Sequence, residues 1–367
     1  MKKPPFKTSK ISKSKDTELE TKLREYMARR YPWLTYYNSR KSYALRRFEF
    51  VITNSDLMGK KIAKELDEKL EMVLAAENCH AKIKKDRLVI TVPREEKDTL
   101  FLGAGLAELM HEEKYPIRAY VGECDDGTAG VIDFNAVPHL MIAGATGSGK
   151  TVCLNDILLT LMYKYTPQEV NFFILDDKNE LAVYKNEPHV IETAFDSDDF
   201  LHVLKRAESE MATRKRLIGD TRLAVNIDEY NRSASEPLPH LFIVFDEADV
   251  VLKKGSKHPS AAFAKTLAEE IVGQGRSLGI HLIIGTQKPI KDVIDTTIKS
   301  NIPGRIALHV TNHHDSNVIL DESGAENLTG NGDALMKLNG KTRRIQCAFV
   351  DSEERAAAIS QLQGGKK

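Results

Sequence analysis

Short apolar runs alternate with amphipathic stretches along the chain from about residue 139 onward. Five runs lack polar alternation, which predicts strands that are buried on both faces and lie mostly parallel. They fall at residues 140–143, 170–175, 241–245, 281–285 and 305–309. Helical periodicity between them, at 201–218 and 263–274, predicts helices that cover the sheet, and a hairpin about Asn339-Gly340 closes the pattern. The alternation predicts an α/β fold with a mostly parallel sheet.

A different mixture of elements comes before this region and predicts a small α+β domain. Strands are expected at 47–53, 81–83 and 88–92, helices at 57–76 and 100–110, and a hairpin of 117–121 with 130–134. We therefore expect four parts along the chain. They are a basic, partly disordered arm (1–45), the small domain (46–134), the large α/β domain (135–355) and a flexible tail (356–367).

Charge is distributed unevenly, although the formal net charge is zero. Residues 1–47 carry 14 Lys or Arg and 4 Asp or Glu, whereas the remainder carries 39 basic and 49 acidic residues. A basic arm before an acidic body indicates either a polyanionic partner or a docking tail, and a solvated terminus is the alternative. Trp33, Tyr36 and Tyr37 stand among basic residues of this arm, so they either stack on bases or anchor the arm to a domain.

Cysteine usage and hydropathy exclude two classes of protein. Cys79, Cys124, Cys153 and Cys347 form no C-x-x-C pair, which excludes a disulfide scaffold and a structural zinc site and fits a reducing cytosol. No apolar run approaches the roughly 18 residues of a membrane helix. The basic N-terminus also lacks the apolar stretch of a signal peptide. We expect a cytoplasmic location, with any membrane association made through a partner.

Residues 144–151 read Gly-Ala-Thr-Gly-Ser-Gly-Lys-Thr and match the phosphate-loop pattern G-x-x-x-x-G-K-[ST] in full. The predicted strand before them and helix after them are the context that this motif requires. The candidate ligands are Gly144, Ala145, Thr146, Gly147, Ser148, Gly149, Lys150 and Thr151. Backbone N–H groups of the loop would hold phosphates, Lys150 would reach the β- and γ-phosphates, and Thr151 would ligate Mg²⁺.

Polar residues follow two other predicted strands, where a parallel sheet would bring them to the same edge. Asp246-Glu247 comes directly after residues 241–245. We expect Asp246 to hold Mg²⁺ and Glu247 to polarise the attacking water. Gln287 follows 281–285 and would sense the γ-phosphate, and capping of the strand end is its alternative role.

Hydrolysis of a nucleoside triphosphate gains from an arginine that meets the developing charge. Arg276 and Arg305 are both candidates, and their spacing does not choose between them. If a neighbouring subunit donates the arginine, the active unit is a ring. Asp176-Asp177-Lys178 could stand at a subunit junction or be a solvated strand end. We expect His313-His314-Asp315 to form an exposed loop, not a metal site.

Further motifs follow one another in fixed order across residues 138–350. They are 138–144, 175–181, Glu210-Met211 with Arg214, 227–231, 275–282, 286–289, 300–307, and Asp315-Ser316 with 319–321. Together they resemble the FtsK/SpoIIIE family of DNA translocases, and a weaker likeness reaches back to about residue 45. The resemblance implies a RecA-like motor that hydrolyses ATP with Mg²⁺ and assembles as a hexameric ring around double-stranded DNA. It places Lys150, Thr151, Asp246, Glu247 and Gln287 in the roles given above, and 222–231 and 311–317 in pore-facing loops.

Some positions depart from the family pattern. Asp177 stands where the family often has proline, and Asn317 replaces the arginine that often follows Asp-Ser. Membrane segments and a C-terminal winged-helix module are not seen in the sequence.

We therefore expect an ATP-driven DNA translocase that serves transfer or replication of a plasmid or integrative conjugative element. The alternatives are a coupling ATPase that recruits a nucleoprotein complex, with a relaxase, replication or secretion-channel protein as partner, and an FtsK-like ATPase that moves proteins.

Overall fold

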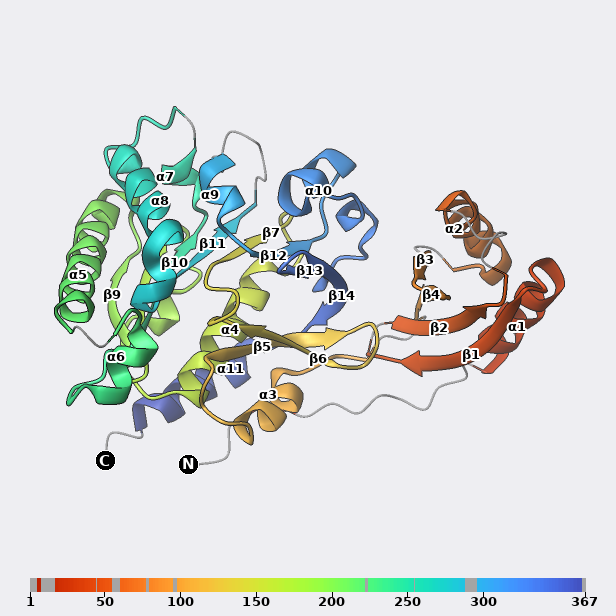
Figure 1. Ribbon diagram of the computed structural model, residues 1–367, viewed down its shortest axis with the longest axis horizontal. Helices are drawn as coiled ribbons and strands as arrows, with labels where there is room; N and C mark the ends of the chain where they lie inside the picture. The colour runs from red at the N-terminus through yellow and green to blue at the C-terminus, as the bar shows by residue number, and fades with distance from the viewer. Residues whose placement is uncertain are drawn as a thin grey trace.

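The computed structural model describes residues 5–7, 17–43, 45–54, 60–76, 79–94, 98–221, 224–253, 255–287 and 296–364. These residues fold into two lobes, each built on its own β-sheet, and the small lobe stands at the right of Figure 1. The predicted architecture, a mostly parallel α/β sheet preceded by a small α+β domain, is confirmed.

The small lobe contains a four-stranded antiparallel sheet in the order β1-β2-β4-β3. Its elements are α1 (Thr17–Arg30), β1 (Leu34–Lys41), β2 (Leu45–Ile52), α2 (Lys60–Leu74), β3 (His80–Lys84) and β4 (Arg87–Pro93). Alternate residues of the strands, such as Phe48 and Ile90, point to one face of the sheet because side chains alternate along a strand. On that face they pack in one core with Leu23 of α1 and Leu70 of α2.

The large lobe contains a ten-stranded sheet in the order β6-β5-β14-β13-β12-β7-β11-β10-β8-β9. Its strands are β5 (Arg118–Cys124), β6 (Ala129–Asp133), β7 (Leu140–Ala143), β8 (Val170–Asp176), β9 (Val190–Ala194), β10 (His240–Asp246), β11 (Ile280–Thr286), β12 (Gly304–Leu308), β13 (Asp333–Leu338) and β14 (Lys341–Cys347). The strands from β12 to β9 are parallel, and the rest form an antiparallel extension. The parallel strands therefore end at one edge, where α/β folds bind ligands.

Helices cover both faces of the large sheet, which explains why its central strands are apolar throughout. They are α3 (Leu102–Met110), α4 (Lys150–Lys164), α5 (Phe200–Asp220), α6 (Ile227–Ser233), α7 (Asp249–Leu252), α8 (Ala261–Leu278), α9 (Thr296–Ser300), α10 (His313–Leu320) and α11 (Ser352–Gly364), with short turns η2 (Ala182–Tyr184), η3 (Ser197–Asp199) and η4 (Ala325–Asn327). Phe242 and Val244 of β10 share a core with α4, whereas Ile243 shares one with α5 and α8.

Three segments outside the candidate site lie differently from what the sequence led us to expect. The hairpin of β5 and β6, expected in the small domain, pairs with β14 and extends the large sheet. The edge strand β9 has no counterpart in the prediction, and α11 continues to Gly364 within the expected flexible tail. The pairing of β5 with β14 joins residues more than 200 positions apart, which local patterning does not reveal. The domain limits themselves stay a prediction.

The aromatic residues of the basic arm point in different directions. Tyr36 packs edge-on against Phe50, with 5.7 Å between the ring centroids, and Trp33 packs against the same core. Tyr37 is 55% exposed and lies under the Arg87 guanidinium, which is 3.9 Å from its ring centroid. Tyr36 and Trp33 thus anchor the arm to the small sheet, as one of the two alternatives predicts.

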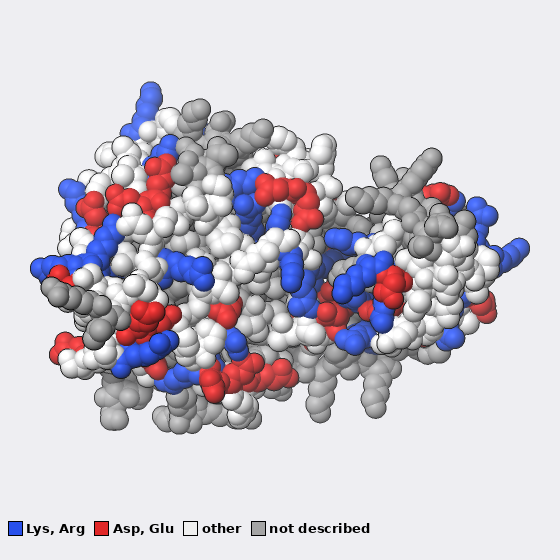
Figure 2. All heavy atoms as spheres, viewed as in Figure 1, with Lys and Arg blue, Asp and Glu red and all other residues white. Residues whose placement is uncertain are grey.

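Charged side chains line the junction between the lobes, where Figure 2 shows basic and acidic atoms together. Nη1 of Arg47 in β2 lies 3.5 Å from Asp125 Oδ2, in the turn between β5 and β6. Nη1 of Arg40 donates to the Asp126 carbonyl at 3.3 Å. Part of the excess positive charge near the N-terminus is therefore matched by acidic groups of the large lobe.

All four cysteines are free thiols and are buried, as in a protein without a disulfide framework. Within the described residues, every helix is too short or too polar to cross a lipid bilayer.

Candidate active site

The phosphate loop joins β7 to α4 at the carboxyl edge of the parallel strands. Gly147 and Gly149 have φ values of +79° and +108°, in a region that side chains disfavour. Gly144 is also required, since a Cβ there would lie 2.6 Å from Ser148 Oγ. Because α4 begins at Lys150, its first N–H groups have no carbonyl partner within the helix. A glycine-rich turn before a helix N-terminus is a binding site for phosphate.

Lys150, Asp246 and Glu247 meet in one buried cluster beside this loop. Lys150 Nζ forms an ion pair with Asp246 Oδ1 and lies 2.9 Å from Glu247 Oε1. Lys178, which the sequence predicts only at a subunit junction or a solvated strand end, approaches the same Glu247 oxygen at 3.1 Å. The side chains of Lys150 and Asp246 are 3% and 0% exposed, so their charges are shielded from bulk water. The predicted proximity of the lysine to the two carboxylates is thus present in the fold.

Burial and charge together set the proton affinities in this cluster. Burial lowers the pKa of Lys150, but the Asp246 and Glu247 carboxylates outweigh it and raise this pKa above its usual value. Burial raises the pKa of Asp246, and the Lys150 charge offsets only part of that effect. For Glu247, burial is outweighed by Lys150 and Lys178, so its pKa is lowered. Lys150 and Lys178 therefore favour the ionised form of Glu247, which is the form that a general base requires.

Backbone strain marks the end of β10. Glu247 has φ of +57°, in the left-handed region that residues with long side chains seldom adopt. The neighbouring strand β11 carries Gly285, where a Cβ would lie 2.6 Å from Asp246 Oδ1. A glycine at this position makes room for the buried carboxylate. Strained residues of this kind concentrate at functional sites.

Asp176 shapes the turn after β8, from which further charged residues reach the site. The side chain is buried and accepts hydrogen bonds from the N–H groups of Lys178 (3.0 Å) and Leu181 (2.7 Å). Glu180, in the same turn, accepts a hydrogen bond from the Thr151 hydroxyl. Asp176 is therefore a buried capping residue and not a solvated strand end, and it positions Lys178 and Glu180 beside the phosphate loop.

The oxygen atoms at this edge fit a divalent cation. Asp246 Oδ2 is buried and has no hydrogen-bond partner among the described residues. The Thr151 hydroxyl lies beside the Glu180 carboxylate. Carboxylate and hydroxyl oxygens suit Mg²⁺, which takes one or two protein ligands together with phosphate oxygens. Thr151 and Asp246 would hold such an ion, and Glu180 is a charged neighbour that the sequence analysis does not identify.

Gln287 connects the phosphate loop to the acidic pair. Its Oε1 accepts a hydrogen bond from the Thr146 hydroxyl at 2.8 Å. Its backbone N–H donates to Glu247 Oε2 at 3.4 Å. This position follows from the parallel pairing of β11 with β7, which brings the two strand ends together. Residues 288–289 of the same predicted motif lie outside the described residues.

A cavity of about 470 Å³ adjoins the phosphate loop, and its lining does not include Lys150, Asp246 or Glu247. It is lined by Gly147, Gly149 and Val152, and by residues 98–100, 331–332 and 346–349. The Phe349 ring is 42% exposed, and its centroid is 6.3 Å from that of Phe101. An exposed aromatic ring beside a phosphate loop offers a surface on which a base can stack. Sequence analysis does not detect this cavity because its lining comes from separate segments.

The two candidate arginines lie away from this cluster. Arg305, at the start of β12, is buried, donates to three backbone carbonyls and pairs with Asp321. Arg276 is exposed near the end of α8, beside the amino-terminal edge of the sheet. A seven-residue strand such as β11 spans about 20 Å at the usual rise per residue. Arg276 is therefore far from the phosphate loop of its own chain, whereas Arg305 pairs in register with Met141 of β7 and has its guanidinium held by the contacts above.

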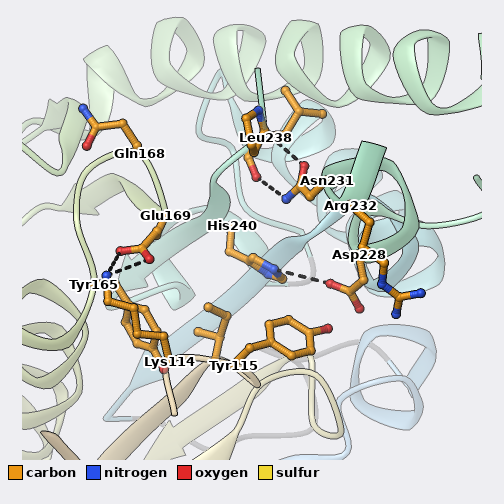
Figure 3. Close-up of a pocket in the computed structure, with 12 residues that line it drawn as sticks. Lys114, Tyr115, Tyr165, Gln168, Glu169, Asp228, Asn231, Arg232, Leu238 and His240 are labelled. Atoms are coloured by element: carbon orange, nitrogen blue, oxygen red, sulfur yellow. Dashed lines mark hydrogen bonds and ion pairs between the residues drawn. The ribbon is translucent and has the colours of Figure 1, made fainter. Parts of the chain in front are cut away.

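A second cavity, of about 340 Å³, opens at the amino-terminal edge of the sheet (Figure 3). Figure 3 shows Asp228 of α6 pointing toward His240 at the start of β10, with 3.8 Å between Oδ1 and Nε2. His240 Nδ1 in turn lies 2.9 Å from His281 Nε2. Asn231 makes two hydrogen bonds of 2.8 Å with the backbone of Leu238, which closes the loop before β10. These contacts hold the edge together by hydrogen bonds between uncharged groups, and Asp228 and His240 form an ion pair only when His240 is protonated.

The segments expected in pore-facing loops lie partly in helices. Residues 222–223 are outside the described residues, and 227–231 lie in α6. Asn312 caps α10 by accepting a hydrogen bond from the Asp315 N–H at 2.9 Å. His313 and His314 are exposed, but the expected loop is wrong, because they form the first turn of this capped helix.

Comparison with known proteins agrees with this geometry. Residues 106–291 match the model of the FtsK/SpoIIIE family. The chain is 34% identical over 316 residues to DNA translocase FtsK of Clostridium acetobutylicum and 35% identical over 288 residues to DNA translocase SftA of Bacillus subtilis. These alignments cover 81% and 76% of this chain and 40% and 30% of the relatives. The chain thus spans less than half the length of the curated relatives it matches.

Solved structures give the same assignment of the fold. The pCW3 conjugation coupling protein TcpA, in a monomer form with ATPγS, is 22% identical with a TM-score of 0.64, covering 94% of this chain and 99% of that one. The cytoplasmic domain of the type VII secretion ATPase EccC of Thermomonospora curvata is 24% identical with a TM-score of 0.60, covering 70% and 32%. These likenesses confirm the RecA-like fold of a P-loop ATPase. With its phosphate loop, acidic pair and Gln287 inside the matched residues, the chain belongs to the FtsK/SpoIIIE family.

Proposed function

We propose that this chain is the motor of an ATP-driven double-stranded DNA translocase. The observation that carries the proposal is the buried cluster of Lys150, Asp246 and Glu247 beside a glycine-rich phosphate loop. A charged cluster with a free carboxylate oxygen is what a nucleotide with its metal ion would complete. The DNA translocases among the family members support double-stranded DNA as the polymer that is moved.

The residues of the site divide the chemistry of hydrolysis among them. Bound Mg²⁺, held by Thr151 and Asp246, would offset negative charge on the phosphates. Lys150 would leave its carboxylate partners for the β- and γ-phosphate oxygens. Glu247, which stays ionised, would accept a proton from the attacking water. Gln287 touches both the loop and Glu247, so it would transmit changes at the γ-phosphate to the rest of the motor.

Of the two candidate arginines, we favour Arg276 as the residue that acts on a neighbouring subunit. Arg305 already uses its guanidinium for contacts within its own chain. Arg276 is exposed and lies at the opposite edge of the sheet from its own phosphate loop, so it could reach nucleotide only in another copy. This arrangement requires an assembly with repeated contacts between subunits, and the hexameric ring implied by the family resemblance meets that requirement.

Transfer or replication of a plasmid or integrative conjugative element is the biological role that we propose, in the cytoplasm. A coupling ATPase, which recruits a nucleoprotein complex through a relaxase, replication or secretion-channel protein, is the second candidate. The similarity to a conjugation coupling protein over nearly the whole of both chains favours it. An FtsK-like ATPase that moves proteins is the third, supported by the likeness to the secretion ATPase.

An ATPase assay with and without linear duplex DNA separates these functions. We expect duplex DNA to stimulate ATP hydrolysis several-fold, with Lys150→Ala and Glu247→Gln as inactive controls. ATP hydrolysis that ignores duplex DNA but responds to a partner protein would favour coupling or secretion instead.

Mixing two inactive variants tests the proposed subunit contact. Lys150→Ala subunits retain Arg276, and Arg276→Ala subunits retain Lys150. If Arg276 acts on the neighbouring subunit, a mixture should regain part of the activity that each variant lacks. Arg305→Ala should not complement Lys150→Ala in this way, because its defect would lie in folding.

A further inference from the structure

Phe6 and Lys7, near the N-terminus, are docked on the large lobe, although the small lobe follows them closely along the chain. The Phe6 ring packs edge-on against Tyr163 of α4, with 5.2 Å between centroids. The backbone N–H of Lys7 donates to Glu354, and Lys7 Nζ pairs with Asp351. These contacts define a binding groove for residues 5–7 between α3, α4 and the start of α11.

Gly103 of α3 forms the floor of this groove. A Cβ at this position would lie 2.5 Å from the Lys7 carbonyl oxygen and 2.7 Å from Phe6 Cβ. The absence of a side chain in α3 therefore permits the docked segment to lie directly against the helix. An alanine at 103 would displace the segment without changing any residue of the segment itself.

The docked segment contacts Phe101, whose ring packs against Phe349 in the wall of the cavity beside the phosphate loop. Lys7 Nζ lies over the ring of Phe101, 5.5 Å from its centroid. The backbones of Phe101 and Phe349 form a parallel bridge, in which the Phe349 N–H donates to the Leu100 carbonyl at 2.7 Å. Leu100 and Phe349 both line the cavity. Lys7 thus contacts one of the two aromatic rings that pack together at this wall.

Lys7 also contacts the residues that follow Phe349 in the sequence, at the start of α11. Asp351 and Glu354 cap α11 reciprocally, since Asp351 Oδ1 accepts from the Glu354 N–H at 2.8 Å and Glu354 accepts from the Asp351 N–H at 3.4 Å. Lys7 bonds to both carboxylates of this cap, two and five residues after Phe349. Phe349 is therefore restrained through Phe101 and through the start of α11.

We propose that Phe6 and Lys7 are positioning residues of the nucleotide site, which hold Phe101 and Phe349 so that the exposed Phe349 ring stacks on the nucleobase. The proposal rests on the ATP site argued above and adds a role for the N-terminal arm. Lys7 and Phe6 do not touch the phosphate loop, so they act on the base and not on the phosphates. Loss of the contacts made by Phe6 and Lys7 lowers the fraction of molecules in which the cavity can bind the nucleobase.

The test compares two ligands on the full-length chain, ATP and inorganic tripolyphosphate, each titrated with Mg²⁺ by calorimetry. Phe6→Ala and Gly103→Ala should each raise the Kd for ATP about five-fold, if the cavity is then competent about a fifth of the time. The Kd for tripolyphosphate, which has no base, should stay unchanged. Phe349→Ala should show the same pattern, and Lys7→Arg should keep the wild-type Kd for ATP because it keeps the cation.

Gly219→Ala is the matched control, because Gly219 also lies in a helix but a Cβ there meets nothing within 4 Å. An unchanged Kd for ATP in Phe6→Ala and Gly103→Ala would overturn the proposal. A parallel loss of affinity for ATP and tripolyphosphate would also overturn it, since it would indicate general damage to the loop. If the wild-type chain bound neither ligand, the proposed ATP site itself would fail. Retained ATP binding that depends on Lys150 but not on Phe6 would leave that site intact and refute only the positioning role.

Discussion

The parallel sheet carries a buried polar cluster at each of its two edges, and the two clusters have opposite chemistry. At the carboxyl edge, Lys150 is held between two carboxylates, and one of these, Asp246, has an oxygen without a partner among the described residues. At the amino edge, His139, His240 and His281 lie at or near the starts of β7, β10 and β11. The same strands thus connect a charged cluster to a cluster of imidazole rings.

The histidines are neutral, because burial lowers the pKa of His139 and of His240 to about 4 and that of His281 well below its usual value. His281 is bonded at both ring nitrogens, to His240 at 2.9 Å and to the Pro138 carbonyl at 2.9 Å. The comparison teaches that burial of polar groups does not by itself identify a site. At the amino edge, His139 Nε2 and Asp228 Oδ1 also lack a hydrogen-bond partner among the described residues, so an unmade hydrogen bond does not identify the site either. The reactive edge is the one where buried ionised groups stand beside the phosphate loop.

Lys150→Ala should give the largest effect, because it removes the only described cation that touches both carboxylates. We expect loss of ATP binding and hydrolysis, and a loss of unfolding free energy of about 3–5 kcal/mol, as when one partner of a buried ion pair is removed. Lys164→Ala at the other end of α4 is a matched control, since Lys164 is also buried but bonds the Leu109 and Glu112 carbonyls. Calorimetric titration and urea unfolding measure both quantities. ATP binding that survives in Lys150→Ala would contradict the assignment of the charged edge.

Glu247→Gln should give the second-largest effect. Loss of the general base should lower kcat about 100- to 1000-fold and leave ATP affinity nearly unchanged. A steady-state ATPase assay with a parallel binding titration measures the two. A variant that lost affinity as strongly as turnover would show that Glu247 acts mainly on binding.

Acidification should lower the free energy of unfolding through the buried histidines of the amino edge. Because the folded pKa values of His139 and His240 lie below the unfolded value, the unfolded state binds more protons between about pH 6.5 and 4, so stability is lost as pH falls through this window. Each such histidine contributes a slope of about 1.4 kcal/mol per pH unit. Urea unfolding between pH 4 and 7 gives the slope, and His281→Phe should reduce it without changing ATP affinity at neutral pH. An identical slope in this variant would contradict the neutral cluster.

Lys178→Ala should give the smallest effect. Lys178 helps to lower the pKa of Glu247, so its removal should raise that pKa and move the acid limb of the pH–rate profile to higher pH. The side chain is 42% exposed, so turnover at neutral pH should fall less than about two-fold. Lys185→Ala, an exposed lysine in the same connection, should leave the profile unchanged. A shift to lower pH in Lys178→Ala would contradict the contact with Glu247.

The contiguous parts of the site could be predicted from sequence alone. Residues 144–151 specify a loop whose glycines, lysine and threonine have fixed roles within one turn, so the motif and its flanking elements suffice. The proximity of Asp246 and Gln287 to that loop followed from one further rule, that parallel strands end at a common edge. The apolar runs also predicted the central strands to within one or two residues.

Contacts between distant segments could not be predicted in the same way. Glu180 and Lys178 reach the site because buried Asp176 folds the turn after β8, and local sequence does not report the direction of that turn. The pairing of β5 with β14 and the groove for Phe6 depend on the path of the whole chain. The α10 helix was not predicted, although Asn312 and Asp315 form a capping signal. The polar run His313-His314-Asp315 was interpreted as an exposed loop instead.

The docking of residues 5–7 has a mechanical consequence for the small lobe. That lobe is joined to the large one covalently at residues 93–98, and the chain that leads into α1 is held on the large lobe as well. The small lobe is thus connected to the large lobe at both of its ends, in addition to the contacts of Arg47 with Asp125 and of Arg40 with the Asp126 carbonyl. Releasing Lys7 would remove one of these connections, so a partner that captured the N-terminal residues would loosen the attachment of the small lobe to the motor.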